Sequence, residues 1–148
     1  MILYLDTSAL VKLYVEEQGS AEIRAAVDTA QAVCTSMVAY VEVHAALARA
    51  ADEGRITGQE RARAVADFRA DWPEYAVVQV TQRVADLAAE LALAHGLRGF
   101  DAIHLGSALV VRAESGAEVR FLAWDERIRR AAQAAGFAGP DEPGTLRS

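Results

Sequence analysis

The chain opens with MILYLDTSAL (residues 1–10), an apolar run that ends in a carboxylate and passes directly into a helix-forming stretch. The apolar residues predict a short buried strand over residues 2–6, ended by the charge of Asp6. Periodic apolar residues then predict a helix from Ser8 to about Gln18. Parallel sheets bind ligands beyond the carboxyl ends of their strands, so a carboxylate at this place is a candidate functional group.

Strands and helices alternate along the rest of the chain, and no linker-like stretch divides it. Apolar runs predict three further strands, over residues 32–35, 76–80 and 119–124. Helices are predicted between and after them, with Ser20, Ser36, Thr57 and Thr81 as caps, over residues 20–29, 37–53, 57–71, 81–96, 100–115 and 125–135. The alternation implies an α/β protein in which helices cover both faces of a parallel sheet. We expect one domain over residues 1–148, with an irregular tail from about residue 138.

Composition and charge narrow the function. The chain has 148 residues, 53% of them hydrophobic, which suits one domain with a core of its own. A single cysteine, Cys34, excludes an internal disulfide and suggests a reducing compartment. The net charge of −6 argues against a protein that coats nucleic acid through bulk positive charge. It leaves open an enzyme that handles nucleic acid through bound metal ions.

Localisation signals are missing from the opening segment. Its apolar run is far shorter than the roughly 20 residues that a membrane span needs. It also lacks the basic start and the cleavage site of a signal peptide, so we expect a cytoplasmic protein. The sequence contains neither the Gly-x-x-x-x-Gly-Lys phosphate loop nor the Gly-x-Gly-x-x-Gly dinucleotide-binding motif, so chemistry with a nucleotide cofactor has no support.

Four carboxylates stand where such a fold places functional groups. Asp6 ends the first predicted strand, Asp125 follows the strand over 119–124, Asp101 opens a helix, and Glu42 lies in an apolar run. Each has a simpler explanation on its own, because aspartate is a common helix N-cap and a helical glutamate can face water or an arginine. Together they indicate a cluster of like charge at one edge of the sheet.

A cluster of carboxylates repels itself unless a cation is present. Two charges about 4 Å apart cost about 1 kcal/mol in water and about 4 kcal/mol at an effective dielectric constant of 20. Mg²⁺ and Mn²⁺ prefer carboxylate oxygens and retain water that completes their coordination. With one or two such ions, a bound water becomes a nucleophile toward a phosphodiester.

The order of these segments carries a family resemblance. LDTSAL (5–10), Glu42, FDAIH (100–104) and WD (124–125) together resemble the PIN-domain family. Within that family, the size and the DTSAL and DAIH segments are similar to the VapC-type toxins of bacterial toxin–antitoxin pairs. The resemblance extends from Met1 to about Phe137.

The resemblance implies a three-layer α/β sandwich and an endoribonuclease that depends on Mg²⁺ or Mn²⁺, with one or two ions. The residues that it marks as catalytic and metal-binding are Asp6, Glu42, Asp101 and Asp125, with Asp6 and Asp101 as the principal ligands. It implies an RNA substrate, a cognate antitoxin, a homodimer and no membrane association. One departure affects Asp125: many relatives carry a hydroxyl residue two positions earlier, where this chain has Ala123.

Several neighbouring residues are candidates for supporting roles. The hydroxyl of Ser8 or Thr7 is expected to orient Asp6, or else to cap the first helix. Lys12, Arg98 and His104 are candidates for contact with RNA phosphates. The competing interpretation is a solvated surface charge for Lys12 and Arg98, and a structural histidine for His104.

Two other functions remain open at this point. A PIN-like module without catalysis would bind a partner only, and manganese binding would distinguish it from a nuclease. A phosphatase with Asp6 as covalent nucleophile is the second alternative. Such enzymes need a second aspartate two positions later, where this chain has Ser8, and a late lysine, whereas the only lysine is Lys12.

Overall fold

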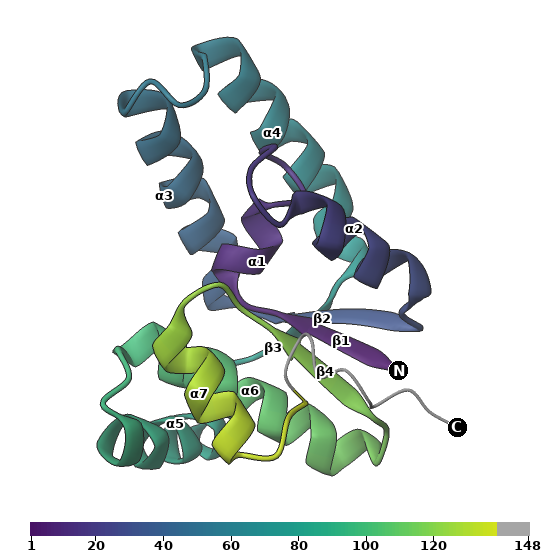
Figure 1. The fold of residues 1–148 in the computed structure, drawn as a ribbon, viewed down its shortest axis with the longest axis vertical. Coiled ribbons are helices and arrows are strands. Elements are labelled where there is room, and N and C mark those ends of the chain that lie inside the picture. Colours follow the sequence, from purple (N-terminus) through teal and green to yellow (C-terminus); the bar gives the residue numbers. More distant parts are fainter. Residues whose placement is uncertain (139–148) are drawn as a thin grey trace.

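The sheet has four parallel strands in the order β3-β2-β1-β4 (Figure 1). The structure is a computed structural model that describes residues 1–138; the predicted tail, apart from Ala138, lies outside the described residues. The strands are β1 (Ile2–Leu5), β2 (Ala32–Ser36), β3 (Ala76–Val78) and β4 (Val119–Leu122). The central strand β1 pairs with β2 on one side and with β4 on the other.

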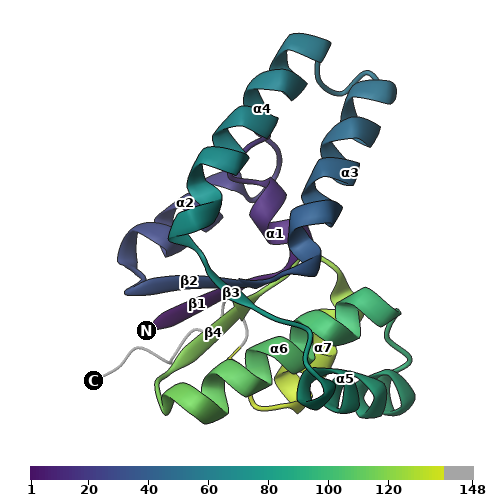
Figure 2. The ribbon, with the colours of Figure 1, turned by 180° about the vertical axis from the view of Figure 1, so that it is seen from behind.

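Helices cover both faces of the sheet, which confirms the predicted three-layer α/β fold. Figures 1 and 2 show α1 to α4 on one face and α5 to α7 on the other. Their bounds are α1 Thr7–Val11, α2 Ser20–Thr29, α3 Val38–Asp52, α4 Gly58–Asp71, α5 Gln82–His95, α6 Gly99–Ser115 and α7 Glu126–Ala134, with a 3-10 turn over Trp72–Glu74. No helix within residues 1–138 is long and apolar enough to cross a membrane.

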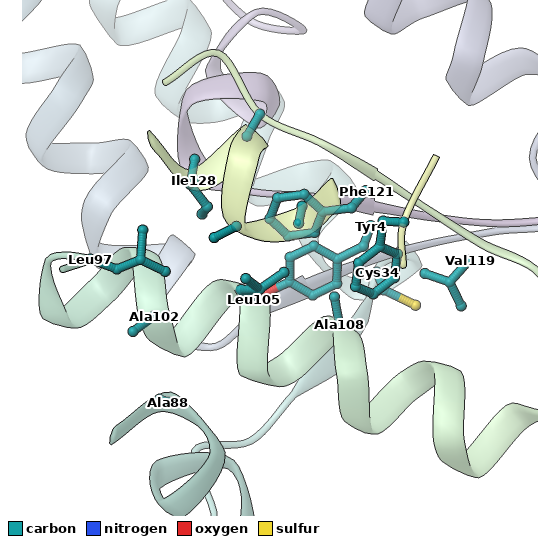
Figure 3. Close-up of a cluster of buried hydrophobic side chains, with 14 residues drawn as sticks. Tyr4, Cys34, Ala88, Leu97, Ala102, Leu105, Ala108, Val119, Phe121 and Ile128 are labelled. Carbon is teal, nitrogen blue, oxygen red and sulfur yellow. The ribbon is translucent and has the colours of Figure 1, made fainter. Parts of the chain in front are cut away.

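The two faces of the sheet bury two separate sets of side chains, because successive residues of a strand point to opposite faces. Tyr4 of β1 packs with Phe121 of β4 in the core beneath α5, α6 and α7, and their rings stack with centroids 5.4 Å apart (Figure 3). Leu3 and Leu5 pack with Leu122 in the core beneath α1 to α4. Both cores therefore depend on the same strand.

Most predicted helix ends are confirmed. Thr57 and Glu60 form the capping box that begins α4, and the side chain of Thr81 accepts a hydrogen bond from the Val84 N–H at the start of α5. Ser36 was predicted as the cap of α3, which is wrong by one residue: the N-cap is Met37, although the Ser36 hydroxyl accepts from the Val38 N–H. Strands β3 and β4 each end two residues earlier than predicted.

The first helix is much shorter than the predicted span from Ser8 to Gln18, because α1 ends at Val11. Beyond it the amides of residues 12–14 donate to carbonyls three residues back, a tighter turn than an α-helix makes. The Ser20 hydroxyl holds the following loop, since it accepts from the Glu17 N–H and donates to the Val15 carbonyl. Ser20 was predicted as the cap of α2, which is wrong. The N-cap is Gly19, whose φ of 95° favours glycine.

The packing of α5 against α6 depends on Gly106, which gives a test. A Cβ at this position would lie 3.2 Å from the Val84 carbonyl oxygen and 3.3 Å from the Ala88 nitrogen, both backbone atoms of α5. We expect Gly106→Ala to lower the free energy of unfolding by about 1–2 kcal/mol, because overpacking outweighs the better helix propensity of alanine. The matched control is Gly58→Ala, where a Cβ meets nothing within 4 Å. Urea unfolding measures both, and equal effects would contradict this packing.

Candidate active site

The four predicted carboxylates line one cavity beyond the carboxyl edge of the sheet. Asp6 follows β1, Asp125 follows β4, Glu42 lies on α3, and Asp101 lies in the first turn of α6. All four line a cavity of about 380 Å³. The fold thus brings together side chains up to 119 positions apart in the sequence, because parallel strands end at the same edge.

Asp6 is almost fully buried at the floor of this cavity. Its Oδ1 accepts hydrogen bonds from the Ala9 N–H at 2.9 Å and from the Ser8 hydroxyl at 2.7 Å, so Asp6 also caps α1. Both of these hydrogen bonds end on Oδ1, which keeps Oδ2 available as a ligand atom. Burial raises the pKa of Asp6, and the nearby charge of Asp101 adds to the effect.

Glu42 is held by two donors from other elements. Its Oε1 accepts from the Thr7 hydroxyl at 2.5 Å and lies 2.9 Å from Nε2 of His104. Burial acts to raise the pKa of Glu42, but the hydrogen bonds from His104 and Thr7 outweigh it, and the pKa is lowered. Thr7 was predicted as a partner of Asp6; it instead orients Glu42.

The ring of His104 links Glu42 to the core of the protein. Its Nδ1 lies 2.9 Å from the hydroxyl of Tyr4. A neutral ring that accepts from Tyr4 at Nδ1 donates from Nε2 to Glu42, and this arrangement gives a partner to the buried Tyr4 and His104 and to the half-buried Glu42. His104 is only 1% exposed and is hydrogen-bonded through both ring nitrogens, which favours the structural interpretation over contact with RNA. Tyr4 was not predicted; the only signal in the sequence is a hydroxyl in an otherwise apolar strand.

Ser8 connects the ends of two strands. Its hydroxyl donates to Asp6 and accepts from the Trp124 N–H at 3.1 Å. The orienting bond to Asp6 matches the sequence-based expectation. Ala123 provides no hydroxyl near Asp125, but Ser8 fixes the neighbouring backbone of Trp124 from the other side.

Asp101 and Asp125 both line the cavity, and their charges repel each other. Burial raises the pKa of Asp101, and the charges of Asp125 and Glu42 add to it. Asp125 is exposed and caps α7, accepting from the N–H groups of Arg127 at 2.9 Å and Ile128 at 3.3 Å. Its capping role and its place at the cavity therefore coexist.

The donor set suits a hard divalent cation, because it consists of carboxylate oxygens with an excess of negative charge. Within residues 1–138, however, no three His, Cys, Asp or Glu side chains converge tightly enough to form a ready-made metal cluster. The raised pKa values of Asp6 and Asp101 indicate charge that a cation would relieve. The four carboxylates are therefore suitable ligands for a divalent cation by their chemistry, but their side chains are not already in a coordinating geometry.

The predicted cationic contacts differ in their availability. Lys12 is buried, pairs with Glu17 at 2.9 Å, and lies 4.6 Å from the ring centroid of Trp124. The solvated surface charge of the competing interpretation does not fit this environment. A phosphate contact stays a prediction, because Lys12 lines the acidic cavity. Arg98 is exposed and lines both the acidic cavity and a neighbouring cavity of about 580 Å³.

Fold and site together define a class: α/β proteins whose parallel sheet carries an acidic cavity at its carboxyl edge. The family model described as PIN domain matches residues 3–134. The chain belongs to the PIN-domain family.

Curated relatives place the chain within that family. It is 43% identical over 135 residues to ribonucleases VapC45 and VapC49 of Mycobacterium tuberculosis, covering 91% of this chain and 92% of each relative. It is 37% identical to ribonuclease VapC46 of the same species, over 92% of this chain and 94% of that relative. These relatives support the VapC-type branch predicted from the sequence.

Solved structures share the fold. A toxin–antitoxin complex from Klebsiella pneumoniae aligns with a TM-score of 0.66 at 18% identity, over 95% of this chain and 99% of the other. The Mycobacterium tuberculosis toxin VapC20, described as cleaving the sarcin–ricin loop, aligns with a TM-score of 0.64 at 22% identity, over 95% and 99%. At these identities the likeness establishes the three-layer fold alone.

The electrostatics of Asp101 give a second test. Its pKa is raised above the ordinary 3.8, so folding disfavours the ionised form and the protein loses stability above that pH. We expect metal-free Asp101→Asn to unfold at a higher temperature than wild type at pH 7, because the amide has no charge for the site to disfavour. The gain should shrink as the pH falls toward 3.8, where the wild-type carboxyl is protonated too.

Thermal unfolding across this pH range makes the measurement. The control is Asp28→Asn, an exposed carboxylate on α2 outside the acidic cavity. A gain for Asp101→Asn that is independent of pH, or equal to that of the control, would contradict the assigned repulsion.

Proposed function

We propose that this protein is a divalent-metal-dependent endoribonuclease and the toxin of a toxin–antitoxin pair. Membership of the PIN-domain family and 43% identity to VapC ribonucleases make it a hydrolase acting on RNA. The observation that carries the proposal in the structure is the convergence of four carboxylates on one cavity. Their site roles are part of the proposal.

The acidic cavity supports a metal-binding role for all four side chains. Asp6, through its available Oδ2, and Asp101 would hold Mg²⁺ or Mn²⁺, with Asp125 and Glu42 as direct or water-mediated partners. A bound divalent cation supplies Lewis acidity and lowers the pKa of bound water. VapC ribonucleases of the PIN-domain family generally depend on a divalent metal; the ion used and whether one or two are bound belong to the proposal.

The protein's own groups supply orientation and proton acceptance. Glu42 stays ionised near neutral pH, because its pKa is lowered by the hydrogen bonds that fix its Oε1. It is therefore suited to accept a hydrogen bond from water inside the cavity and to orient that water. Tyr4 and His104 do not touch substrate in this scheme; they keep Glu42 in one rotamer from within the core.

The proposed partners follow from the family. One structural neighbour described as a toxin and a second solved as a toxin–antitoxin complex support a small antitoxin protein as inhibitor of this chain. An acidic cavity suits a basic inhibitory segment on that partner. A homodimer and a cytoplasmic location, where the RNA substrate is found, complete the proposal.

Two other functions have less support. A non-catalytic module would not bind manganese. The one observation in its favour is that residues 1–138 contain no ready-made metal cluster. Calorimetric titration with Mn²⁺ distinguishes the two, because an intact nuclease site binds the ion. The aspartate phosphatase loses support further, since Ser8 is committed to Asp6 and Trp124, and Lys12 to Glu17.

Removing either principal carboxylate gives the direct test of the nuclease. We expect Asp6→Asn and Asp101→Asn each to lower RNA cleavage by more than the roughly 10–100-fold that loss of an outer-shell group costs. Asparagine can still cap α1 in place of Asp6, and Asp101 is not the cap of α6, so both variants should fold, as circular dichroism will verify. The assay compares purified proteins with Mg²⁺, Mn²⁺ or chelator, with Asp28→Asn as control. Cleavage at wild-type rates by both variants would overturn the assignment.

A further inference from the structure

We propose that a single strand of RNA lies along one continuous trough, held by arginines on both sides of the acidic site. The trough consists of the acidic cavity and the neighbouring cavity, which share Arg98, Asp101 and Asp125 among their lining residues. Because the shared residues border both cavities, the two spaces adjoin there. This inference rests on the proposed nuclease function and adds how the substrate is held.

The arginines form two groups on either side of the carboxylates. Arg49 of α3 and Arg55, which follows that helix, line only the acidic cavity; we call them the α3 group. Arg127 and Arg130 of α7 line only the neighbouring cavity and form the α7 group. Helices α3 and α7 lie on opposite faces of the sheet (Figure 1). A strand that contacts both groups therefore passes over the carboxylates at the sheet edge.

The charge along the trough suits a phosphate backbone once the four site carboxylates are set aside. Lys12 and Glu17 pair with each other. The remaining charged lining, with histidines taken as neutral, is five arginines against one glutamate, Glu126. A protein with a net charge of −6 thus places a local excess of cations beside its acidic centre.

These arginines are free enough to exchange partners. All four residues of the two groups are exposed. Arg55 pairs with Glu53 at 2.9 Å and Arg130 with Glu126 at 2.7 Å, in exposed ion pairs that contribute little to stability. Guanidinium groups bind phosphate through two parallel hydrogen bonds, which compensates for such losses.

The trough favours a single strand over a duplex. Cavities of about 380 and 580 Å³ have the volumes of sites that hold small molecules, which is the size of an unpaired nucleotide. The carboxylates in the middle repel phosphates, so contacts on both flanks are needed to hold the scissile phosphate there. The substrate must therefore extend in both directions from the cleaved bond.

Paired charge-removal variants test this arrangement. The α3-group variant is Arg49→Gln with Arg55→Gln, and the α7-group variant is Arg127→Gln with Arg130→Gln. The control, Arg24→Gln with Arg83→Gln, removes the same charge from exposed ion pairs to Glu16 and Glu114, outside the trough. Binding of a fluorescent 12-nucleotide single-stranded RNA is measured by anisotropy at several salt concentrations, with Asp101→Asn in every protein to prevent cleavage.

We expect each trough variant to weaken binding by about tenfold or more, and the control to leave it unchanged. The slope of log affinity against log salt should fall in magnitude by about 0.7 for each lost phosphate contact. In the cleavage assay, with Asp101 intact, each trough variant should raise KM and leave kcat within about twofold. RNA shortened from either end should raise KM for the wild-type protein.

Each other outcome is informative. Equal weakening by the control would indicate bulk charge, and an effect of one group alone would place the strand on one side; both overturn the trough. Competition by polyglutamate as effective as that by RNA would indicate an acidic peptide and also overturn it. If the wild-type protein cleaves RNA and the arginine variants cleave it equally well, the trough is refuted but the nuclease function is not. A wild-type protein that neither binds nor cleaves RNA refutes the proposed function itself.

Discussion

The hydrogen bonding of β1 on both its sides is the constraint from which the site follows. β1 pairs in parallel with β2 and β4, and the pairing continues past the strand, where the Asp6 N–H donates to the Leu122 carbonyl at 3.2 Å. This register sets Asp6 beside the end of β4, from which Trp124 and Asp125 follow. The same strand supplies Tyr4, so β1 positions both a core side chain and the first carboxylate of the acidic cavity.

The ionised carboxylates of this site lower the stability of the folded protein. Burial raises the pKa of Asp6 and Asp101, which means that folding holds two carboxylates in an unfavourable environment at neutral pH. A fold selected for stability alone would place amides or apolar groups there. The acidity of the whole chain is thus partly a local property of the site, and the arginines beside it keep the surface accessible to a polyanion.

Much of the fold and of the candidate site could be predicted from the sequence, because both follow from local patterns. Strand–helix alternation and capping residues such as Thr57 predicted the three layers, and the rule for strand ends placed Asp6 and Asp125 at one edge. Glu42 and Asp101 lie on helices, and the family resemblance assigned them to the same site. Tertiary contacts could not be predicted in this way. The bond from Tyr4 to His104 joins residues 100 positions apart, and periodicity identifies buried residues without their hydrogen-bond partners. The end of α1 at Val11 likewise depends on a loop held by Ser20.

The double use of the Ser8 hydroxyl has a mechanical consequence. One oxygen joins the carboxylate after β1 to the backbone after β4, so the two strand ends are cross-braced by a single atom. The Asp6 carboxylate is thereby fixed relative to the Trp124 backbone, one residue before Asp125. The two strand ends that carry site carboxylates therefore owe their relative position partly to one side chain.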